Sequence, residues 1–340
     1  MATRKVSISS PLLGALVRMV AWLSAWLPLR FSRALGRLFG QIAAVGRTRL
    51  RSVTELNIAL CLPELSLGER RRLVRRSLIE TGATASEMGA LWGRSPEELV
   101  NLVVSVAGGE LLESAVKAGN GVILLLPHIG NWEIFNPILT QRGRFFALYR
   151  SARIDQIDRM IRESRERTGC RMAPATSGGV RLLLRALRDG EVVVILPDQE
   201  PVEAAGDYGE FFGVQALTMT LVRGLLLRTG ATALYGVALR GPSGRFEINY
   251  LPAPEGLDDQ DVEVALTRLN HGVERCIQLC PEQYQWSYKR FKSRPEGELT
   301  PYRSRSFEPQ NIEFVDPVVL ERLGYCAAGS VRLGEKPQEK

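Results

Sequence analysis

A histidine and a glutamate lie five residues apart at the end of an apolar run, in the stretch GVILLLPHIGNWE at residues 121–133. His128 is one of only two histidines in 340 residues. On a continuous helix, with about 3.6 residues per turn, residues five apart face different directions. Gly130 tolerates unusual backbone dihedrals and Asn131 is a good N-cap for a following helix. We therefore expect a strand-to-helix corner at which His128 and Glu133 meet.

A histidine paired with a glutamate can act as a general base. A neutral imidazole held by a carboxylate has a fixed tautomer and takes a proton from a hydroxyl as that hydroxyl attacks a carbonyl. The sequence has no G-x-S-x-G elbow and no cysteine close to His128, so we expect direct transfer to an acceptor hydroxyl without a covalent enzyme intermediate. The structural alternative makes His128 a polar strand end and Glu133 a first-turn acid stabilised by the helix dipole.

The elements that must position this pair follow an alternating pattern. Helices are expected over 69–92 and from Pro96, and short apolar runs then alternate with amphipathic stretches. This alternation predicts an α/β fold, with a mostly parallel central sheet flanked by helices. Ligands bind beyond the carboxyl ends of strands in such sheets, and His128, Arg150 and Asp198 each follow a predicted strand. The predicted strands are 121–126, 145–149, 191–196, 232–240 and 245–251, and the predicted helices are 132–140, 155–168, 178–189, 215–229 and 260–279.

The positive charge of the chain is concentrated in its first 54 residues. Nine of the 44 Lys and Arg residues precede Glu55, the first acidic residue, which leaves 35 basic against all 37 acidic residues in the remainder. This basic segment also carries leucines, valines and tryptophans that a nucleic-acid-binding arm does not need. A membrane surface accounts for both the charge and the hydrophobicity, and we expect no nucleic-acid partner.

The apolar stretch 6–29 predicts a hydrophobic membrane-anchoring helix. About 20 residues suffice to cross a bilayer, but Arg18 near the centre makes this stretch either a marginal span or an interfacial anchor. A pair of helices packed on the body of the protein is the alternative, and a cleaved signal peptide fits less well because Arg18 interrupts the apolar core. The denser basic cluster after residue 29 favours a protein body on the cytoplasmic side.

The cysteines favour neither a disulfide framework nor a metal site. All five are scattered, and none forms a C-x-x-C pair or lies beside a histidine at ligand spacing. Two histidines far apart in sequence also make a metallohydrolase a poor choice. We expect no metal and no cofactor.

Several segments of the chain resemble one family of enzymes. The block at 121–133 is similar to the His-x4-acid motif of glycerolipid acyltransferases, and its Gly-Asn-Trp-Glu form resembles the bacterial lipid A late (secondary) acyltransferases, the lauroyl and myristoyl transferases. The resemblance runs in order over roughly residues 10 to 298. It includes ELNIALCLPELSLGERRRL at 55–73, LYR at 148–150, VVVILPDQE at 192–200, GEFFG at 209–213 and QWSYKRFKSRPEGE at 285–298.

The resemblance implies a glycerolipid acyltransferase-like fold and transfer of a fatty acyl chain from acyl carrier protein to a hydroxyl of a lipid A precursor. Acyl-acyl carrier protein is then a co-substrate, His128 is the base and Glu133 orients it. The implied place is the cytoplasmic face of a bacterial inner membrane. We accordingly divide the chain into a basic hydrophobic membrane anchor (1–54), an acyltransferase domain (55–298) and a C-terminal extension (299–340).

Other positions in the resembling segments are candidates for binding. Arg150 is expected to stabilise the developing oxyanion or to hold Glu133, with a solvated strand-end arginine as the alternative. Backbone N–H groups of Gly130 and Asn131 are competing oxyanion donors. Asp198 and Gln199 resemble the Asp-Gln motif of that family and are candidates for binding the headgroup of the acceptor or of the donor, with a turn-capping Asp as the alternative.

The last resembling segment carries Arg290 and Lys292, which are candidates for phosphate contact on the lipid or on the phosphopantetheine arm of the carrier. Two residues depart from the commoner family pattern: Tyr288 stands where a histidine is frequent, and Glu200 replaces an aspartate.

Two other functions remain alternatives at this point. The same chemistry can serve another acceptor, such as a phospholipid, glycolipid or aminolipid, or use acyl-CoA as the donor. A non-catalytic membrane-tethered binding protein is the alternative outside enzymes, although such a protein does not need a base at residue 128.

Overall fold

The protein is described by a computed structural model over residues 28–151, 155–302 and 317–322. The chain divides into two compact units. Unit 1 comprises Met1–Gly40, Glu80–Leu196 and Leu225–Ala253, and unit 2 comprises Gln41–Ile79, Pro197–Gly224 and Pro254–Lys340.

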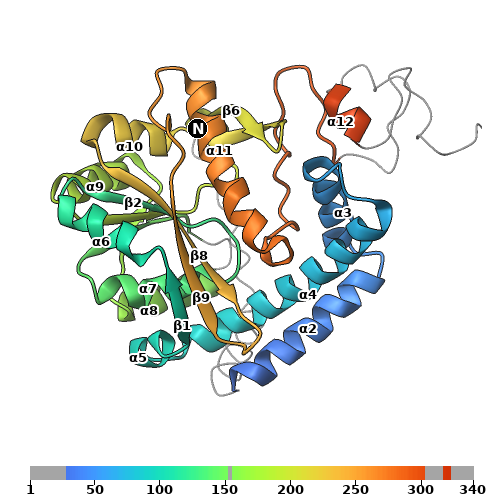
Figure 1. Cartoon of the computed structure of the whole chain (residues 1–340), viewed down its shortest axis with the longest axis horizontal. Coiled ribbons are helices and arrows are strands. Elements are labelled where there is room, and N and C mark those ends of the chain that lie inside the picture. Colours follow the sequence, from blue (N-terminus) through green and yellow to red (C-terminus); the bar gives the residue numbers. More distant parts are fainter. Residues whose placement is uncertain (1–27, 152–154, 303–316, 323–340) are drawn as a thin grey trace, which may run out of the picture. The chain divides into compact units, whose positions relative to one another are not determined.

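Unit 1 is built on a seven-stranded sheet with strand order β1-β9-β8-β2-β5-β3-β4 (Figure 1). All neighbouring strands pair in parallel except β8 and β9, which are antiparallel. Every residue of β2 and of β5 is buried, which explains why their sequences are continuous apolar runs. The strands are β1 (Val103–Ala107), β2 (Val122–Leu125), β3 (Phe145–Tyr149), β4 (Arg171–Pro174), β5 (Val192–Ile195), β8 (Thr232–Arg240) and β9 (Phe246–Pro252).

The crossovers of this sheet are helical, as parallel pairing requires. Figure 1 shows α6 to α9 around the strands. The helices between β1 and β5 are α6 (Gly109–Ala118), the short 3-10 helix η1 (Trp132–Ile134), α7 (Phe135–Thr140), α8 (Asp155–Arg167) and α9 (Ser177–Arg188). From residue 28 onward, the helices before β1 are α2 (Leu29–Val45), α3 (Arg49–Cys61), α4 (Leu67–Trp92) and α5 (Pro96–Val100).

Unit 2 contains an antiparallel hairpin of β6 (Gly206–Phe211) and β7 (Val214–Met219). The two residues between these strands, Phe212 and Gly213, both have positive φ, 51° and 69°, as a two-residue type I′ turn requires. After the hairpin, α10 (Leu221–Thr229) leads to β8 and β9 of unit 1. The chain then returns to unit 2 with α11 (Val262–Leu279), η3 (Pro281–Gln283) and α12 (Pro317–Arg322).

The predicted α/β class and the mostly parallel sheet are confirmed, and each predicted strand is present within about two residues of its expected bounds. The prediction of one helix over 215–229 is wrong, because its first five residues belong to β7 and the helix begins at Leu221. The turn at Phe212-Gly213 makes this segment the second arm of a hairpin. The sequence patterns did not predict β1, β4, α6 or β6.

The predicted anchor at 6–29 lies almost wholly outside the described residues, as does most of the 299–340 extension. Within the described part of the chain, no helix combines the length and the apolar character needed to span a membrane.

Candidate active site

The turn that follows β2 is shaped by Gly130. Its φ is +62°, and a Cβ added to it would collide with the carbonyl oxygen of Ala238 on β8. The backbone N–H of Asn131 donates to that same carbonyl at 2.9 Å, and Thr84 Oγ1 on α4 donates to the carbonyl of Gly130 at 3.3 Å. The turn after His128 is therefore fastened to β8 and to α4, and only glycine fits at residue 130.

Asn131 is the N-cap of the helical turn that carries Glu133, as its sequence position predicts. It is fully buried, and its side-chain oxygen accepts from the backbone N–H of Glu133 at 3.3 Å. Its amide nitrogen donates to Glu87 Oε2 at 2.9 Å. Because the backbone N–H of Asn131 is engaged with Ala238, we assign Asn131 a positioning role in the turn.

Glu133 is 5% exposed and is bound by an arginine that the sequence did not single out. Arg165 on α8 places Nη2 2.5 Å from Oε1 and Nε 3.3 Å from Oε2, so the pair is bidentate. Asn136 Nδ2 donates to Oε2 at 2.9 Å. Burial alone would lower the pKa of the Arg165 guanidinium, but the Glu133 carboxylate outweighs it and raises that pKa above its ordinary value.

His128 is partly buried three residues after β2 ends, where the sequence predicts a ligand-facing edge. Its ring packs edge-on against Trp132, with 4.6 Å between ring centroids and 66° between ring planes. Trp132 belongs to the same short turn as Glu133. The imidazole thus lies against the same short turn that carries the Glu133 carboxylate.

Arg150 follows β3 and is exposed. The sequence suggests Arg150 as one partner for Glu133, but in the structure Arg165 forms that ion pair. The Arg165 guanidinium also lies over the ring of Tyr149, the residue before Arg150, at 5.7 Å from the ring centroid.

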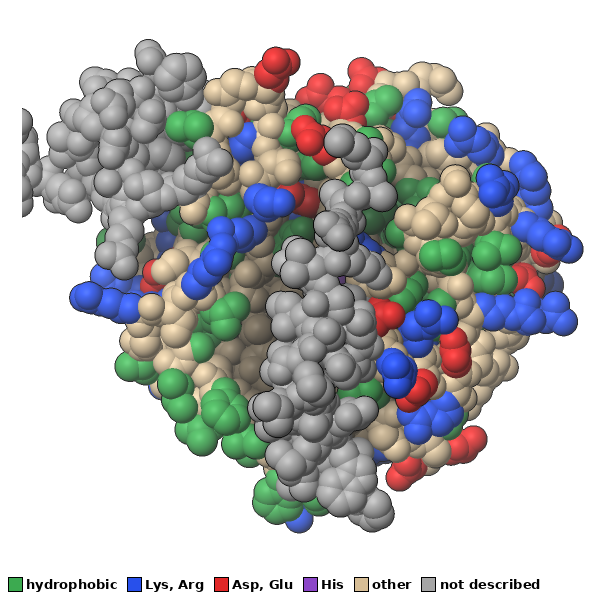
Figure 2. All heavy atoms as spheres, turned by 180° about the vertical axis from the view of Figure 1, so that it is seen from behind, with side chains coloured by type: hydrophobic (Ala, Val, Ile, Leu, Met, Phe, Trp, Pro, Cys, Tyr) green, Lys and Arg blue, Asp and Glu red, His purple; other side chains and the backbone are tan. Residues whose placement is uncertain are grey.

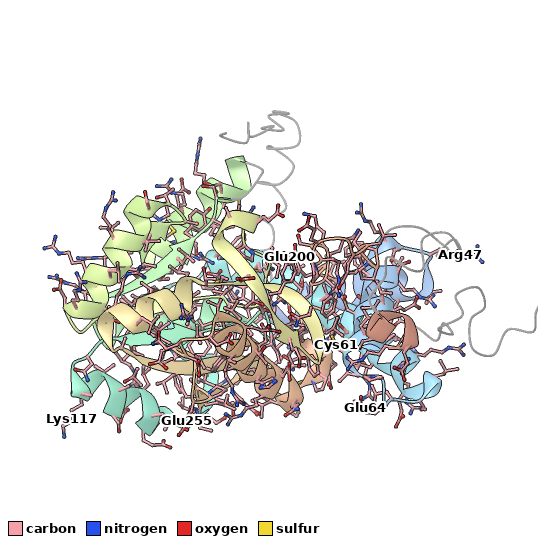
Figure 3. All side chains as sticks on the ribbon, turned by 90° about the horizontal axis from the view of Figure 1, so that it is seen from above. Arg47, Cys61, Glu64, Lys117, Glu200 and Glu255 are labelled. Atoms are coloured by element: carbon pink, nitrogen blue, oxygen red, sulfur yellow. The ribbon has the colours of Figure 1, made fainter. Side chains whose placement is uncertain are left out.

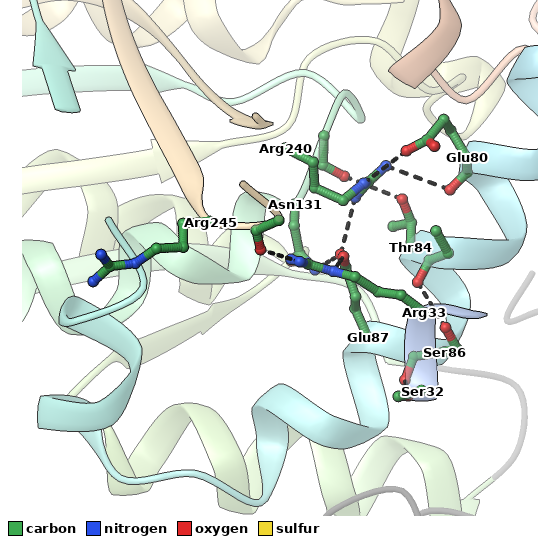
Figure 4. Close-up of polar contacts among 12 residues, drawn as sticks. Ser32, Arg33, Glu80, Thr84, Ser86, Glu87, Asn131, Arg240 and Arg245 are labelled. Carbon is green, nitrogen blue, oxygen red and sulfur yellow. Dashed lines mark hydrogen bonds and ion pairs between the residues drawn. The ribbon is translucent and has the colours of Figure 1, made fainter. Parts of the chain in front are cut away.

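A buried ionic network supports the turn from the side of α4 (Figure 4). Glu87 is fully buried and pairs with Arg33 of α2 and, at 2.9 Å, with Arg240 of β8. Arg240 also pairs with Glu80 at 2.9 Å. Burial lowers the pKa of Arg33 despite the opposing effect of Glu87. Because the second oxygen of Glu87 also accepts from Asn131, this network holds the cap of the corner in place.

Asp198 and Gln199 belong to unit 2, and both are engaged in it. Asp198 is 2% exposed, and burial followed by the nearby Asp198 charge raises the pKa of the Tyr284 hydroxyl well above its ordinary value. Gln199 Nε2 donates to Gln285 Oε1 at 3.1 Å.

Arg290 is 3% exposed inside unit 2 and has a structural role there. Its guanidinium donates to the Leu217 carbonyl at 2.6 Å, to Thr218 Oγ1 at 2.7 Å and to Asn270 Oδ1 at 3.1 Å. It thereby ties β7 to α11, and the phosphate contact expected of Arg290 stays a prediction. Lys292 is exposed, and the phosphate contact expected of it also stays a prediction.

The two departures from the family pattern are neighbours. The backbone N–H of Glu200 donates to the hydroxyl of Tyr288 at 2.9 Å. The Glu200 carboxylate accepts from Ser293 through its backbone N–H at 2.9 Å and its hydroxyl at 3.1 Å. The tyrosine and the longer acid are therefore parts of one local arrangement.

Unit 2 also holds a pocket of about 550 Å³ that contains none of the residues expected to do chemistry. Cys61, the last residue of α3, and Glu64 in the loop after it line this pocket, as do Phe212 and Ile277, and Figure 3 labels the first two. Beside it, Glu274 Oε1 accepts from the Phe212 backbone N–H at 2.5 Å, and burial raises the pKa of Glu274 to about 7.

A mostly parallel sheet in which the strand β2 leads into a His-x4-Glu turn is the arrangement implied by the resemblance to acyltransferases. Comparison with known families identifies the family: the model for the bacterial lipid A biosynthesis acyltransferase family matches residues 2–293, and the chain belongs to that family. It is accordingly an O-acyltransferase.

Relatives from Escherichia coli (strain K12) cover most of the chain. A lipid A biosynthesis lauroyltransferase is 28% identical over 280 residues, which are 82% of this chain and 90% of the relative. A palmitoleoyltransferase is 27% identical over 285 residues, 83% of this chain and 92% of the relative. A myristoyltransferase is 27% identical over 280 residues, 81% of this chain and 84% of the relative.

Proposed function

We propose that the protein transfers a fatty acyl chain from acyl-acyl carrier protein to a hydroxyl of a lipid A precursor, with His128 as the general base. The observation that carries the proposal is the buried carboxylate of Glu133, which Arg165 of α8 binds through both oxygens, in a turn whose Trp132 packs against the His128 ring. A surface acid of ordinary function does not need a bidentate arginine and a second amide donor.

The chemistry needs one base and no covalent intermediate. The acceptor hydroxyl gives its proton to the imidazole as its oxygen attacks the thioester carbonyl, and the carbonyl electrons move onto the oxygen. The resulting tetrahedral oxyanion collapses, the C–S bond breaks, and the thiolate of the carrier arm leaves. The proton on the imidazole then passes to the thiolate, so the base is regenerated.

Glu133 supports the imidazolium that forms transiently in this sequence. Its carboxylate stays fixed because Arg165 and Asn136 bind both of its oxygens, and Asn131 caps its backbone N–H. The oxyanion is assigned to the backbone N–H of Gly130 or to Arg150. Preorganised donors of this kind need no rearrangement as charge develops.

Substrate contacts are assigned to three further residues of the chain. Lys292 is exposed and suited to a phosphate of the lipid or of the carrier arm, and Asp198 with Gln199 forms the headgroup contact. The membrane partner is the cytoplasmic face of a bacterial inner membrane, where both a lipid acceptor and a soluble acyl carrier protein are accessible.

The test is a transfer assay with the purified full chain. Supplied with acyl-acyl carrier protein and a lipid A precursor, the protein should yield a lipid heavier by one fatty acid less one water, together with free carrier thiol. Transfer only from acyl-CoA, or only to a phospholipid, glycolipid or aminolipid, would replace the proposed substrates. Absence of transfer to any of these acceptors would contradict the proposed function.

A further inference from the structure

Helix α2 has its amphipathic character reversed relative to an ordinary surface helix. A surface helix normally buries its bulky apolar residues and exposes its polar ones. On α2 the buried positions are instead mostly small or polar, namely Leu29, Ser32, Arg33, Gly36 and Gly40. The exposed positions are large and apolar, and their exposed fractions run from 48% to 71%: Phe31, Leu35, Leu38, Phe39, Ile42 and Val45.

The small residues on the inner face allow α2 to lie very close to α4. A Cβ at Gly36 would meet the Gly82 carbonyl oxygen, and a Cβ at Gly82 would meet the backbone of Gly36 and Gly40. Ser32 Oγ donates to the Ser86 carbonyl at 2.9 Å. Because this packing fixes the rotation of the helix about its axis, the bulky side chains are held outward.

We propose that the outward face of α2 lies in the headgroup-to-acyl boundary of an anionic lipid bilayer, with the helix axis along the membrane plane. The exposed apolar residues recur mostly at intervals of three or four and so form one straight stripe from Phe31 to Val45, about 21 Å long at about 1.5 Å per residue. Figure 2 shows hydrophobic side chains gathered at its lower left, where α2 lies after the half turn from Figure 1.

Charge complementarity identifies the occupant as anionic lipid. Arg30 and Arg37 on the helix are exposed, as are Arg47 and Arg49 just after it. The sequence has no acidic residue before Glu55. Arg37 pairs with Glu80 of α4 at 3.1 Å, and α2 itself carries no acidic residue. An apolar stripe on such a basic helix matches acyl chains below anionic headgroups, which attract basic residues by about 1 kcal/mol each near the surface.

The same helix is tied to the candidate active site from its other face. Arg33 pairs with Glu87, and Glu87 accepts from Asn131, the cap of the turn that carries Glu133. A lipid-facing α2 therefore holds this turn at a defined distance from the membrane. The identity of the acceptor rests on the proposed function, whereas the membrane contact does not.

The first test measures membrane contact without any activity. In the full chain with Cys280→Ser and Cys326→Ser, Leu38→Cys is labelled with an environment-sensitive fluorophore and mixed with phosphatidylglycerol-containing vesicles that carry nitroxide lipids. We expect strong quenching by nitroxides at the headgroup-to-acyl boundary. The matched control, Leu182→Cys on α9, starts from a side chain that is also exposed and should not be quenched. Equal quenching at both positions, or efficient cross-linking of two copies through residue 38, would overturn the proposal.

The second test separates the membrane contact from catalysis. The triple variant L35Q/F39Q/I42Q should lose about tenfold or more of its transfer to acceptor lipid in vesicles, because three apolar side chains no longer enter the bilayer. Transfer to acceptor in detergent micelles should stay within about twofold. The control L182Q/L227Q/V264Q removes three exposed apolar side chains elsewhere and should keep both activities. If the wild-type chain is inactive in both vesicles and micelles, the proposed function is contradicted. If the L35Q/F39Q/I42Q variant keeps wild-type transfer in vesicles, the membrane contact of α2 is contradicted.

Discussion

The Arg165 guanidinium donates to both carboxylate oxygens of Glu133, which lies 32 residues earlier in the sequence. The shorter of the two distances is 2.5 Å, between Nη2 and Oε1. Both side chains are almost fully buried, so their charges are poorly screened and the pair is held rigidly. A carboxylate fixed in this way can orient an imidazole without swinging out to solvent. This ion pair makes Arg165 the positioning residue of the proposed site.

Replacing Arg165 should therefore reduce catalysis through Glu133. We expect Arg165→Met to lower kcat about 10- to 100-fold with little change in KM, as is typical when a residue that orients a catalytic group is lost. Arg165→Lys should restore only part of the rate, because an ammonium cannot form the bidentate pair. Steady-state kinetics of both variants provide the measurement.

Arg162 offers a matched control on the same helix. It is exposed, and its only recorded ion pair in the described structure is with Glu166 at 3.9 Å. Arg162→Met should keep wild-type kinetics. If Arg162→Met and Arg165→Met lost activity equally, the effect would belong to α8 as a whole and not to the grip on Glu133.

Glu87 should be the most sensitive position of the ionic network. Glu87→Gln leaves Arg33 and Arg240 buried beside a neutral group, and loss of one partner of a buried pair costs about 3–5 kcal/mol in the free energy of unfolding. The double variant Glu87→Gln/Arg33→Met removes one charge of each sign and should recover much of that loss. Urea denaturation of wild type, both single variants and the double variant measures the coupling. A double variant whose loss equals the sum of the two single losses would show that the charges do not interact.

Two glycines of α4 should respond to alanine in opposite directions. At Gly82, a Cβ would collide with the backbone of Gly36, so Gly82→Ala should push α2 away and cost about 1–3 kcal/mol. At Gly68, the nearest atom to a Cβ is a terminal arginine nitrogen at 3.9 Å, so Gly68→Ala should stabilise the helix by up to about 1 kcal/mol. Chemical denaturation and hydrogen exchange of the α2 amides test the pair, and similar effects at the two positions would refute the close packing.

Glu274 should make the stability of the fold depend on pH. Burial raises its pKa to about 7 in the folded chain, so between its ordinary value of about 4.3 and pH 7 the folded state holds a proton that the unfolded chain releases. Its stabilising contribution is complete below about pH 4.3 and is lost as the pH rises through 7. Glu274→Gln stays neutral and should be the more stable protein at pH 8, by about 1–2 kcal/mol after allowance for solvent screening.

Denaturation midpoints at pH 5 and pH 8 check this sign. The difference between wild type and Glu274→Gln should grow with pH, whereas Glu110→Gln, at an exposed position on α6, should run parallel to wild type. A Glu274→Gln variant that loses stability relative to wild type as the pH rises would contradict the assignment.

Local sequence patterns were sufficient to predict the strands that are apolar runs in the sequence, and also the corner after β2. Gly130 and Asn131 encode that corner within four residues, because a positive φ and an N-cap are local requirements. The hairpin of β6 and β7 was missed because its turn places a phenylalanine at positive φ, where a sequence pattern leads one to expect glycine or asparagine.

The supporting charges of the site could not be predicted in the same way. Arg165 is one of four arginines on α8, and Glu87 lies 44 residues before Asn131 on a helix rich in charges. Only the packing of helices against the sheet selects these partners. Arg290 lies inside a motif that suggested substrate binding, but the hydrogen bonds that it makes within the chain tie β7 to α11. The sequence motif alone did not reveal these contacts.

The most direct measurement compares the two histidines of the chain. In the transfer assay with acyl-acyl carrier protein and lipid A precursor, His128→Ala should fold, bind membranes and lose at least about 10²-fold in kcat, the usual contribution of a general base. His271→Ala on α11 should keep wild-type activity. Full activity in His128→Ala, or equal losses in the two variants, would contradict the assignment of His128 as the base.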